Sequence, residues 1–197
     1  MNDLDQWFAD GAEDTLRVDY PLTPDSMFYD VGGNCGSWTK YMTDRYFCHA
    51  RIFEPVPEFH THCANLFVDN PKVTVEPYAL SDHNGNEEIS VHHVDSSFFR
   101  KWEEGYPHLV PVRDVAEVFA DIPDVDLISI NCEGSEFIIL PRLIETGLIG
   151  KFEHVQIQFH RLYPDHERLR HLIRSSLAMT HNQSYAYPFV WESWRIK

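Results

Sequence analysis

The sequence predicts an α/β fold with a mostly parallel sheet and helices on both of its faces. Along the chain, compact apolar runs alternate with stretches of mixed, helix-compatible sequence, and this alternation is typical of parallel strands joined by helices. The chain has 197 residues, of which 43% are hydrophobic and 14% aromatic. This is enough for one well-packed core and short for two, so we expect a single domain over residues 1–197.

The first half of the chain supplies the first two strands. Residues 27–31 (MFYDV) predict a strand, a glycine-rich turn follows, and a helix begins near Ser37. Residues 48–55 (CHARIFEP) predict a second strand, which Pro55 stops. A helix follows through residues 57–70, and it carries four apolar residues at helical spacing on one side: Phe59, Cys63, Leu66 and Phe67.

The middle of the chain departs from simple alternation. Residues 72–80 (KVTVEPYAL) predict a third strand, and the dyad Asn84-Gly85 predicts a tight turn into residues 87–94 (EEISVHHV). Residues 83–111 form a hairpin and aromatic insertion, which we place on the substrate side because flat aromatic faces suit sugars and ring-containing metabolites. A plain hydrophobic patch over the sheet is the alternative. The aromatic residues in question are Phe98, Phe99, Trp102 and Tyr106.

The second half returns to alternation. Residues 126–132 (DLISINC) predict a buried strand, residues 135–147 a helix and residues 154–160 (HVQIQFH) another strand. After a helix at about 165–178, the aromatic segment 184–196 is divided by a proline and predicts a final strand or hairpin at a sheet edge.

Charge and composition exclude several classes of function. The net charge of −15 repels phosphate backbones, so no nucleic-acid partner is expected. The N-terminal extension, residues 1–20, lacks the basic and apolar regions of a secretory signal, and no apolar run is long enough to span a membrane. We expect a cytoplasmic protein with reduced thiols at Cys35, Cys48, Cys63 and Cys132. The pairs His60/His62 and His92/His93 do not have metal-ligand spacing, so no metal site is expected.

The turn after the first strand is the main candidate for a binding site. It reads Asp30, Gly32, Asn34 and Gly36 at alternate positions, and glycines at a strand-to-helix turn let a ligand approach the backbone. The dinucleotide fingerprint needs glycines at three fixed positions, and no starting glycine here meets that spacing. An NAD-dependent oxidoreductase is therefore disfavoured. The alternative is a plain tight turn in which Asp30 is a capping residue.

Glu54, at the end of the second predicted strand, is a candidate for binding a ribose. It follows Gly32 by about 20 positions, the separation at which a strand-end carboxylate reaches ribose hydroxyls. A carboxylate can accept hydrogen bonds from both hydroxyls. The alternative is an ordinary surface glutamate.

Four blocks in order together resemble the FkbM family of S-adenosylmethionine-dependent methyltransferases: YDVGGNCGSWT, IFEPVPE, YALSDHNGNEEISV and VDLISINCEGSEFIIL. The resemblance spans about residues 27–160. It implies a Rossmann-like class I methyltransferase fold, with a seven-stranded sheet whose last strand is antiparallel, and S-adenosyl-L-methionine as cofactor.

The resemblance also assigns the cofactor site. Asp30, Gly32, Gly33, Asn34 and Gly36 would line the methionine end, and Glu54 with Pro55 would hold the ribose. Ala79, Leu80 and Ser81, which end the third predicted strand, would flank the adenine. Asn131 would lie near the sulfonium and the incoming substrate.

Two residues depart from the family pattern. Asn131 stands where family members usually have an aspartate, and Gln158 where an acidic residue is common. Both replacements remove a negative charge and argue against a metal site. Glu133 keeps its place as a catalytic candidate, with a helix cap as its alternative. His160, as a neutral imidazole at the end of the fifth strand, is the expected base, with a structural histidine as its alternative.

The function expected is methyl transfer to a hydroxyl of a sugar, glycan or secondary metabolite, with the hydroxyl preference coming from the resemblance alone. The rival is a catalytically inactive cofactor-binding module or partner subunit, which the residues Asn131 and Gln158 motivate. The expected partner is a small-molecule or saccharide acceptor. No membrane partner is expected, and the formation of a homodimer is left open.

Overall fold

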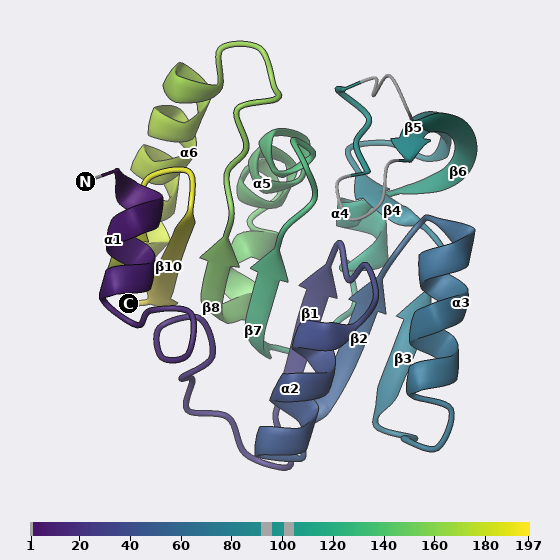
Figure 1. The fold of residues 1–197 in the computed structure, drawn as a ribbon. Coiled ribbons are helices and arrows are strands. Elements are labelled where there is room, and N and C mark those ends of the chain that lie inside the picture. The colour runs from purple at the N-terminus through teal and green to yellow at the C-terminus, as the bar shows by residue number, and fades with distance from the viewer. Residues whose placement is uncertain (1, 92–95, 101–104) are drawn as a thin grey trace.

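A seven-stranded sheet forms the centre of the molecule (Figure 1). The computed structural model describes residues 2–91, 96–100 and 105–197. The strand order is β3-β2-β1-β7-β8-β10-β9. Strands β3, β2, β1, β7 and β8 are parallel, and β10 is antiparallel to both β8 and β9. The prediction of a mostly parallel seven-stranded sheet with an antiparallel last strand is confirmed.

The strands of this sheet agree with most of the predicted segments. They are β1 (Met27–Val31), β2 (His49–Phe53), β3 (Val73–Glu76), β7 (Val125–Ile130), β8 (Phe152–Ile157), β9 (His181–Tyr187) and β10 (Trp191–Ile196). Strands β7 (VDLISI) and β8 (FEHVQI) are buried except at their second residue, and their apolar side chains belong to the main core, as is typical of central parallel strands. They end before Asn131 and His160, so both residues belong to the loops beyond the sheet rather than to the strands.

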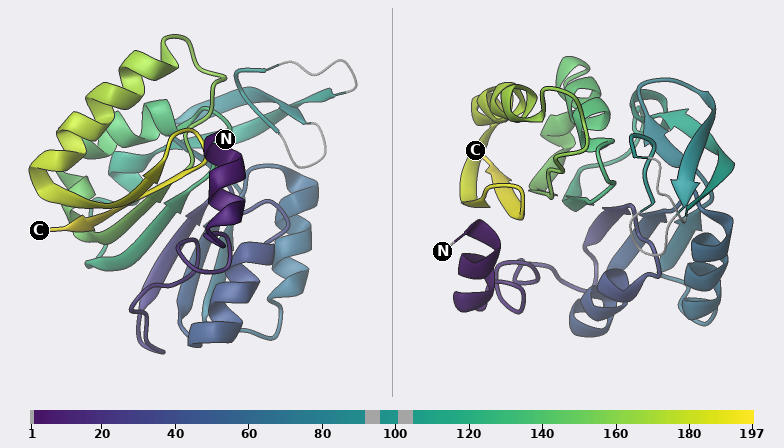
Figure 2. Two further views of the ribbon diagram at one scale, coloured as in Figure 1. Left: turned by 60° about the vertical axis from the view of Figure 1, so that its left-hand side comes forward. Right: turned by 45° about the horizontal axis from the view of Figure 1, so that its top comes forward.

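Helices cover both faces of the sheet, as predicted. On one face α2 (Ser37–Tyr46) and α3 (Pro57–Leu66) pack on the side chains of Phe28, Ile52 and Leu127. On the other face lie α4 (Val115–Val118), α5 (Glu136–Glu145), the short 3₁₀ helix η1 (Leu148–Lys151) and α6 (His166–Thr180). Figure 2 shows the two helical layers from the side. In the apolar stripe predicted for α3, Cys63 and Phe67 are buried whereas Leu66 is exposed.

A second, three-stranded sheet was not predicted. Its order is β4 (Ala79–Ser81), β6 (Tyr106–Asp114), β5 (Gly85–Val91), with β4 parallel and β5 antiparallel to β6. The single strand expected over residues 72–80 is therefore wrong. The chain leaves the main sheet after Glu76 because Pro77 cannot donate to a ladder, and residues 79–81 join the second sheet instead. The strand predicted after Asn84 is present as β5, but it pairs with β6 and not with the strand before the turn.

The aromatic residues expected to cluster in this insertion have different surroundings. Phe98 contacts the small core that lies under the second sheet, and Phe99 packs on Tyr163 with ring centroids 4.9 Å apart. Tyr106 is exposed and donates to Glu58. Trp102 and the pair His92/His93 lie outside the described residues.

The N-terminal segment packs against the C-terminal hairpin (Figure 1). Helix α1 (Asp3–Ala9) buries Trp7 against Tyr185, Tyr187 and Trp191. Further along, the Arg17 guanidinium lies between two indole rings, 4.5 Å from Trp38 and 3.6 Å from Trp191. Such cation–π contacts stabilise a buried cation.

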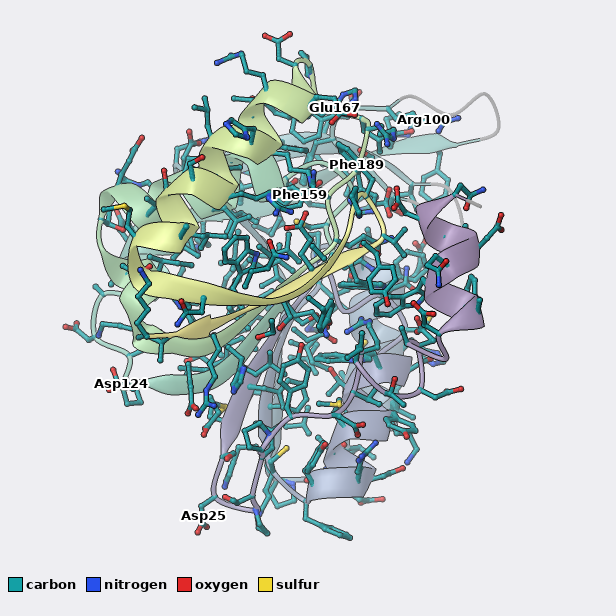
Figure 3. The ribbon with its side chains drawn as sticks, turned by 90° about the vertical axis from the view of Figure 1, so that its left-hand side faces the viewer. Asp25, Arg100, Asp124, Phe159, Glu167 and Phe189 are labelled. Carbon is teal, nitrogen blue, oxygen red and sulfur yellow. The ribbon has the colours of Figure 1, made fainter. Side chains whose placement is uncertain are left out.

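The loops that follow the parallel strands gather at one end of the molecule. Figure 3 shows Asp25 and Asp124, which precede β1 and β7, at the opposite end from Phe159, which follows β8. Ligands of open α/β sheets bind at the carboxyl ends, where the strand order reverses. Here the reversal lies between β1 and β7, and the site is built there.

Candidate functional site

The turn after β1 brings its backbone against the loop after β7. Gly32 has φ +87°, and a Cβ built on it would lie 2.0 Å from the backbone oxygen of Asn131. A Cβ on Gly33 would lie 2.2 Å from a methyl carbon of Ile52. Neither position tolerates a side chain without a shift of the backbone or the core. Gly36, at φ +74°, is the N-cap of α2.

Glu54 connects this turn to the start of α3. It is 4% exposed, and its two carboxylate oxygens accept hydrogen bonds from the backbone N–H groups of Asn34 and Val56, each 2.8 Å long. Burial, together with the nearby charge of Asp30, outweighs these hydrogen bonds and raises the pKa of Glu54 to about 7. Each oxygen keeps a second lone pair for a ligand hydroxyl.

A pocket opens beside Glu54, with about 640 Å³ of empty space when the open solvent at its mouth is included. Apolar side chains form much of its wall, in part from the second sheet. Its lining comprises Val31, Gly32, Asn34, Phe53, Glu54, Pro55, Val56, Phe59, Ala79, Leu80, Ile89, Ser96, Phe98, Asn131, Cys132, Glu133, Ser135 and Ile139.

Two buried oxygen atoms of this lining have no hydrogen-bond partner among the described residues. They are Oδ1 of Asn131 and Oγ of Ser96. Buried polar atoms in proteins are almost always paired, because an unpaired one loses its hydrogen bonds to water without replacement. Unpaired oxygens inside a pocket therefore indicate where a ligand donates hydrogen bonds.

Behind Glu133, a histidine lies between two carboxylates. His160 Nε2 is 3.1 Å from Oε1 of Glu133, and its Nδ1 is 3.2 Å from Oε1 of Glu136. The fully buried Glu136 also accepts from the backbone N–H of His160 at 2.7 Å and of Gly134 at 2.9 Å. The carboxylates therefore hold the imidazole, and the loop before α5, in one orientation.

This surrounding changes the protonation expected for His160. Burial acts to lower its pKa, but the hydrogen bonds and charges of Glu133 and Glu136 outweigh burial and raise the pKa to about 9. The side chain is an imidazolium at neutral pH, with both N–H groups directed at carboxylates. The expectation of a neutral imidazole is wrong, because the sequence did not reveal that two carboxylates would face one ring.

The structure places some of the residues proposed from the sequence in the pocket lining and others outside it. Those in the pocket lining are Gly32, Asn34, Glu54, Pro55, Ala79, Leu80, Asn131 and Glu133. Others support the lining from behind: buried Asp30 accepts a 2.6 Å hydrogen bond from Thr39 on α2, and His160 holds Glu133. Gly33, Gly36 and Ser81 are not in the lining, and the Ser81 hydroxyl lies 3.4 Å from the His83 ring instead.

Ser96, Phe59 and Ile89 are lining residues that the sequence did not indicate. Ile89 lies on β5 of the second sheet, Phe59 packs against the small core under that sheet, and Ser96 precedes Ser97, which bridges to β5. No local sequence pattern predicted this sheet. The strongest signal available was the aromatic character of the insertion, which includes Phe98.

Among the residues that the structure describes, no group of three or more His, Cys, Asp or Glu side chains could hold a metal ion. No helix in the described part of the chain is long and apolar enough to cross a membrane.

Known proteins resemble the chain in sequence and in fold. The family model of the methyltransferase FkbM domain matches residues 30–187, whereas no curated protein sequence matches significantly. Among solved structures, fibrillarin from Aeropyrum pernix, in complex with natively bound S-adenosyl-L-methionine, has a TM-score of 0.51 and 9% identity over 88% of this chain and 67% of that one.

A second similar structure is the Methanococcus jannaschii fibrillarin pre-rRNA processing protein. Its TM-score is 0.54 at 10% identity, over 90% of this chain and 69% of that one. At these identities the likeness concerns the fold.

Proposed function

The chain belongs to the FkbM methyltransferase family, whose cofactor is S-adenosyl-L-methionine, and from this premise we propose that it methylates a hydroxyl oxygen of a sugar, glycan or secondary metabolite. The observation that carries the proposal is the pocket between the glycine turn and Glu133. It joins a largely apolar cavity to a carboxylate able to accept a proton.

The residues present fit the cofactor. Gly32 lines the pocket where an amino acid portion would lie, and a Cβ there would collide with the Asn131 loop that also lines the pocket. Glu54 would accept the ribose hydroxyls through its free lone pairs. Ala79 and Leu80, with the aromatic rings of the wall, would flank the adenine. The unpaired Oδ1 of Asn131 offers an acceptor to the amino group or to the substrate.

When bound, the cofactor supplies an electrophilic methyl group on a positively charged sulfur. The protein must then align the acceptor, exclude water and take the hydroxyl proton. Glu133 is the group we assign to the proton, because its carboxylate lies in the pocket lining and is 22% exposed. His160 is a positioning residue that orients this carboxylate from behind.

The first test measures cofactor binding and methyl transfer separately. Calorimetry with S-adenosyl-L-methionine should show binding, and incubation with methyl-labelled cofactor and a panel of hydroxylated acceptors should label at least one of them. Binding without transfer to any acceptor would favour the rival function, a catalytically inactive cofactor-binding module. The absence of binding would overturn both.

The second test concerns Glu133. Glu133→Gln keeps the hydrogen-bonding shape but cannot take a proton, so kcat should fall by about 100-fold or more while the Kd of the cofactor stays unchanged. Glu153→Gln is the control, since Glu153 lies 40% exposed on β8 and pairs with Arg195. An equal kcat in the two variants would remove Glu133 from the mechanism.

A further inference from the structure

The segment that carries Ser96 is fixed at the pocket from two sides. Ser97 exchanges backbone hydrogen bonds of 2.9 and 3.0 Å with Ser90 on β5, and its hydroxyl donates to the backbone oxygen of Glu133 at 2.7 Å. The Phe99 ring covers Gly134, where a Cβ would lie 2.6 Å from it. Ser96 is therefore held against the same loop that carries Asn131 and Glu133.

The polar atoms around this end of the pocket would be paired by a ligand that donates hydrogen bonds. Oδ1 of Asn131 can only accept a hydrogen bond, the Glu133 carboxylate likewise accepts, and the Ser96 hydroxyl can do either. Asn131 Oδ1 and Ser96 Oγ are buried without a partner among the described residues. A ligand hydroxyl or amine could donate to both atoms, whereas a phosphate or carboxylate could accept from the Ser96 hydroxyl but would leave the Asn131 oxygen unpaired.

Carboxylates of the chain itself take a backbone donor at the start of each helix beside the pocket. At the start of α5 the N–H of Gly134 donates to Glu136, and at the start of α3 the N–H of Val56 donates to Glu54. Glu54 also takes the N–H of Asn34 in the glycine turn. Helix N-termini are ready-made phosphate sites when free, and each of these two already holds a carboxylate of the chain.

The charged side chains of the pocket also disfavour an anionic acceptor. Glu54 and Glu133 are the charged residues in the described part of its lining, which contains neither lysine nor arginine. The positive charge of His160 is directed at two carboxylates. Arg100, the basic residue of the described segment 96–100, is exposed and is not in the lining. An anionic acceptor would thus lose its hydration without gaining a cationic side chain from the described lining.

We infer that the acceptor of the proposed methyl transfer is an uncharged or cationic molecule rich in hydroxyl or amine groups, and that Ser96 and Asn131 hold it. Free glycosides and amino sugars belong to this class, whereas sugar phosphates, nucleotide sugars and uronic acids do not. The inference rests on the proposed function and narrows its substrate class.

The charge of the product tests this inference. The protein is incubated with a small-molecule extract of cells that make it, once with ordinary and once with trideuteromethyl cofactor, and products are recognised by the mass difference between the two reactions. Anion-exchange fractionation then sorts them. We expect at least about tenfold more product in the unretained fraction. A main product that carries phosphate or carboxylate would overturn the acceptor class. Cofactor binding without any product would refute methyl transfer itself, and the inference with it.

The contact with Ser96 is tested by substitution. The acceptor for this test is chosen from the structure of the product identified in the first experiment. Ser96→Ala should raise the acceptor KM about tenfold, the effect of one lost hydrogen bond, with kcat and the Kd of the cofactor nearly unchanged. Ser96→Thr should keep most of the affinity because it keeps the hydroxyl. Ser175→Ala, at an exposed serine on α6, is the control. An acceptor KM in Ser96→Ala equal to that of the control would overturn the contact.

Discussion

At Gly32 the backbone conformation and the close approach of a neighbouring loop exclude any side chain. The positive φ alone disfavours L-residues, and the 2.0 Å separation between a built Cβ and the Asn131 oxygen adds a collision with backbone. Because Asn131 begins the loop that carries Glu133, a shift there would move both halves of the site.

A substitution at Gly32 should therefore damage stability and binding together. We expect Gly32→Ala to lower the free energy of unfolding by about 2–4 kcal/mol and to abolish measurable cofactor binding, as checked by urea denaturation and calorimetry. Gly150→Ala is the control, since Gly150 has no atom within 4 Å of its built Cβ. If the two variants were equally stable, the close approach would be disproved.

We expect Glu54 to make cofactor affinity dependent on pH. Its pKa of about 7 means that the carboxylate form, which we propose accepts the ribose hydroxyls through both oxygens, is lost as pH falls through that value. Affinity should be about tenfold weaker near pH 6 than near pH 8, as measured by calorimetry. Glu54→Gln should bind weakly at both pH values. An unchanged pH dependence in this variant would show that another group is responsible.

His160 contributes to stability in a pH window set by its raised pKa. A histidine whose pKa rises on folding, here to about 9 from the ordinary 6.5, stabilises the fold fully below the unfolded value and loses this contribution as pH rises through the folded one. Tm should fall between about pH 7 and about pH 10 more steeply in the wild type than in His160→Asn. Parallel profiles would contradict the buried ion cluster.

At the scale of elements, α1 is tied to the rest of the fold through one residue in particular. Trp7 is 1% exposed, contacts Tyr187 edge-on at 5.1 Å between ring centroids and donates to Glu13 at 2.9 Å. The neighbouring Phe8 is 62% exposed. The helix therefore docks by one face, as an amphipathic surface helix does.

Removing the two side chains in turn measures this docking. Trp7→Ala should cost about 3–5 kcal/mol of unfolding free energy, the usual range for a buried large aromatic, whereas Phe8→Ala should cost less than about 0.5 kcal/mol. Urea denaturation followed by fluorescence of the remaining tryptophans gives both values. A small effect of Trp7→Ala would mean that α1 contributes little to the folded domain.

At the scale of the whole molecule, the net charge disfavours a nucleic-acid partner. The net charge is −15, and the arginines of the segment 161–174 are engaged: Arg161 with Glu167, Arg168 with Asp165, and Arg170 and Arg174 with the buried Glu192. No basic surface remains in this segment to neutralise phosphates.

We accordingly predict that the protein does not bind RNA. Fluorescence anisotropy with a labelled single-stranded or duplex RNA should show no saturable binding at low salt, where electrostatic attraction is strongest. Tight binding that weakens steeply as salt is added would contradict this prediction and would reveal a basic surface that the described residues do not form.

The sequence by itself determined the fold and the cofactor half of the site. Apolar runs such as residues 27–31 and 126–132 fall in buried strands because their period and composition act locally, and the glycine turn and Glu54 follow strands whose ends the sequence marks. Their meeting at one edge follows from the parallel order alone.

Only the tertiary structure decided the acceptor half. Segments 79–81 and 106–114 pair across a long stretch of chain, so no local pattern announced the second sheet or placed Ser96 beside Asn131. The protonation of His160 likewise depended on Glu133 and Glu136, which face it from another loop. Pairing between distant segments, and the charge around a buried group, depend on neighbours in three dimensions. For this reason the sequence pointed to His160 but did not predict its protonation state.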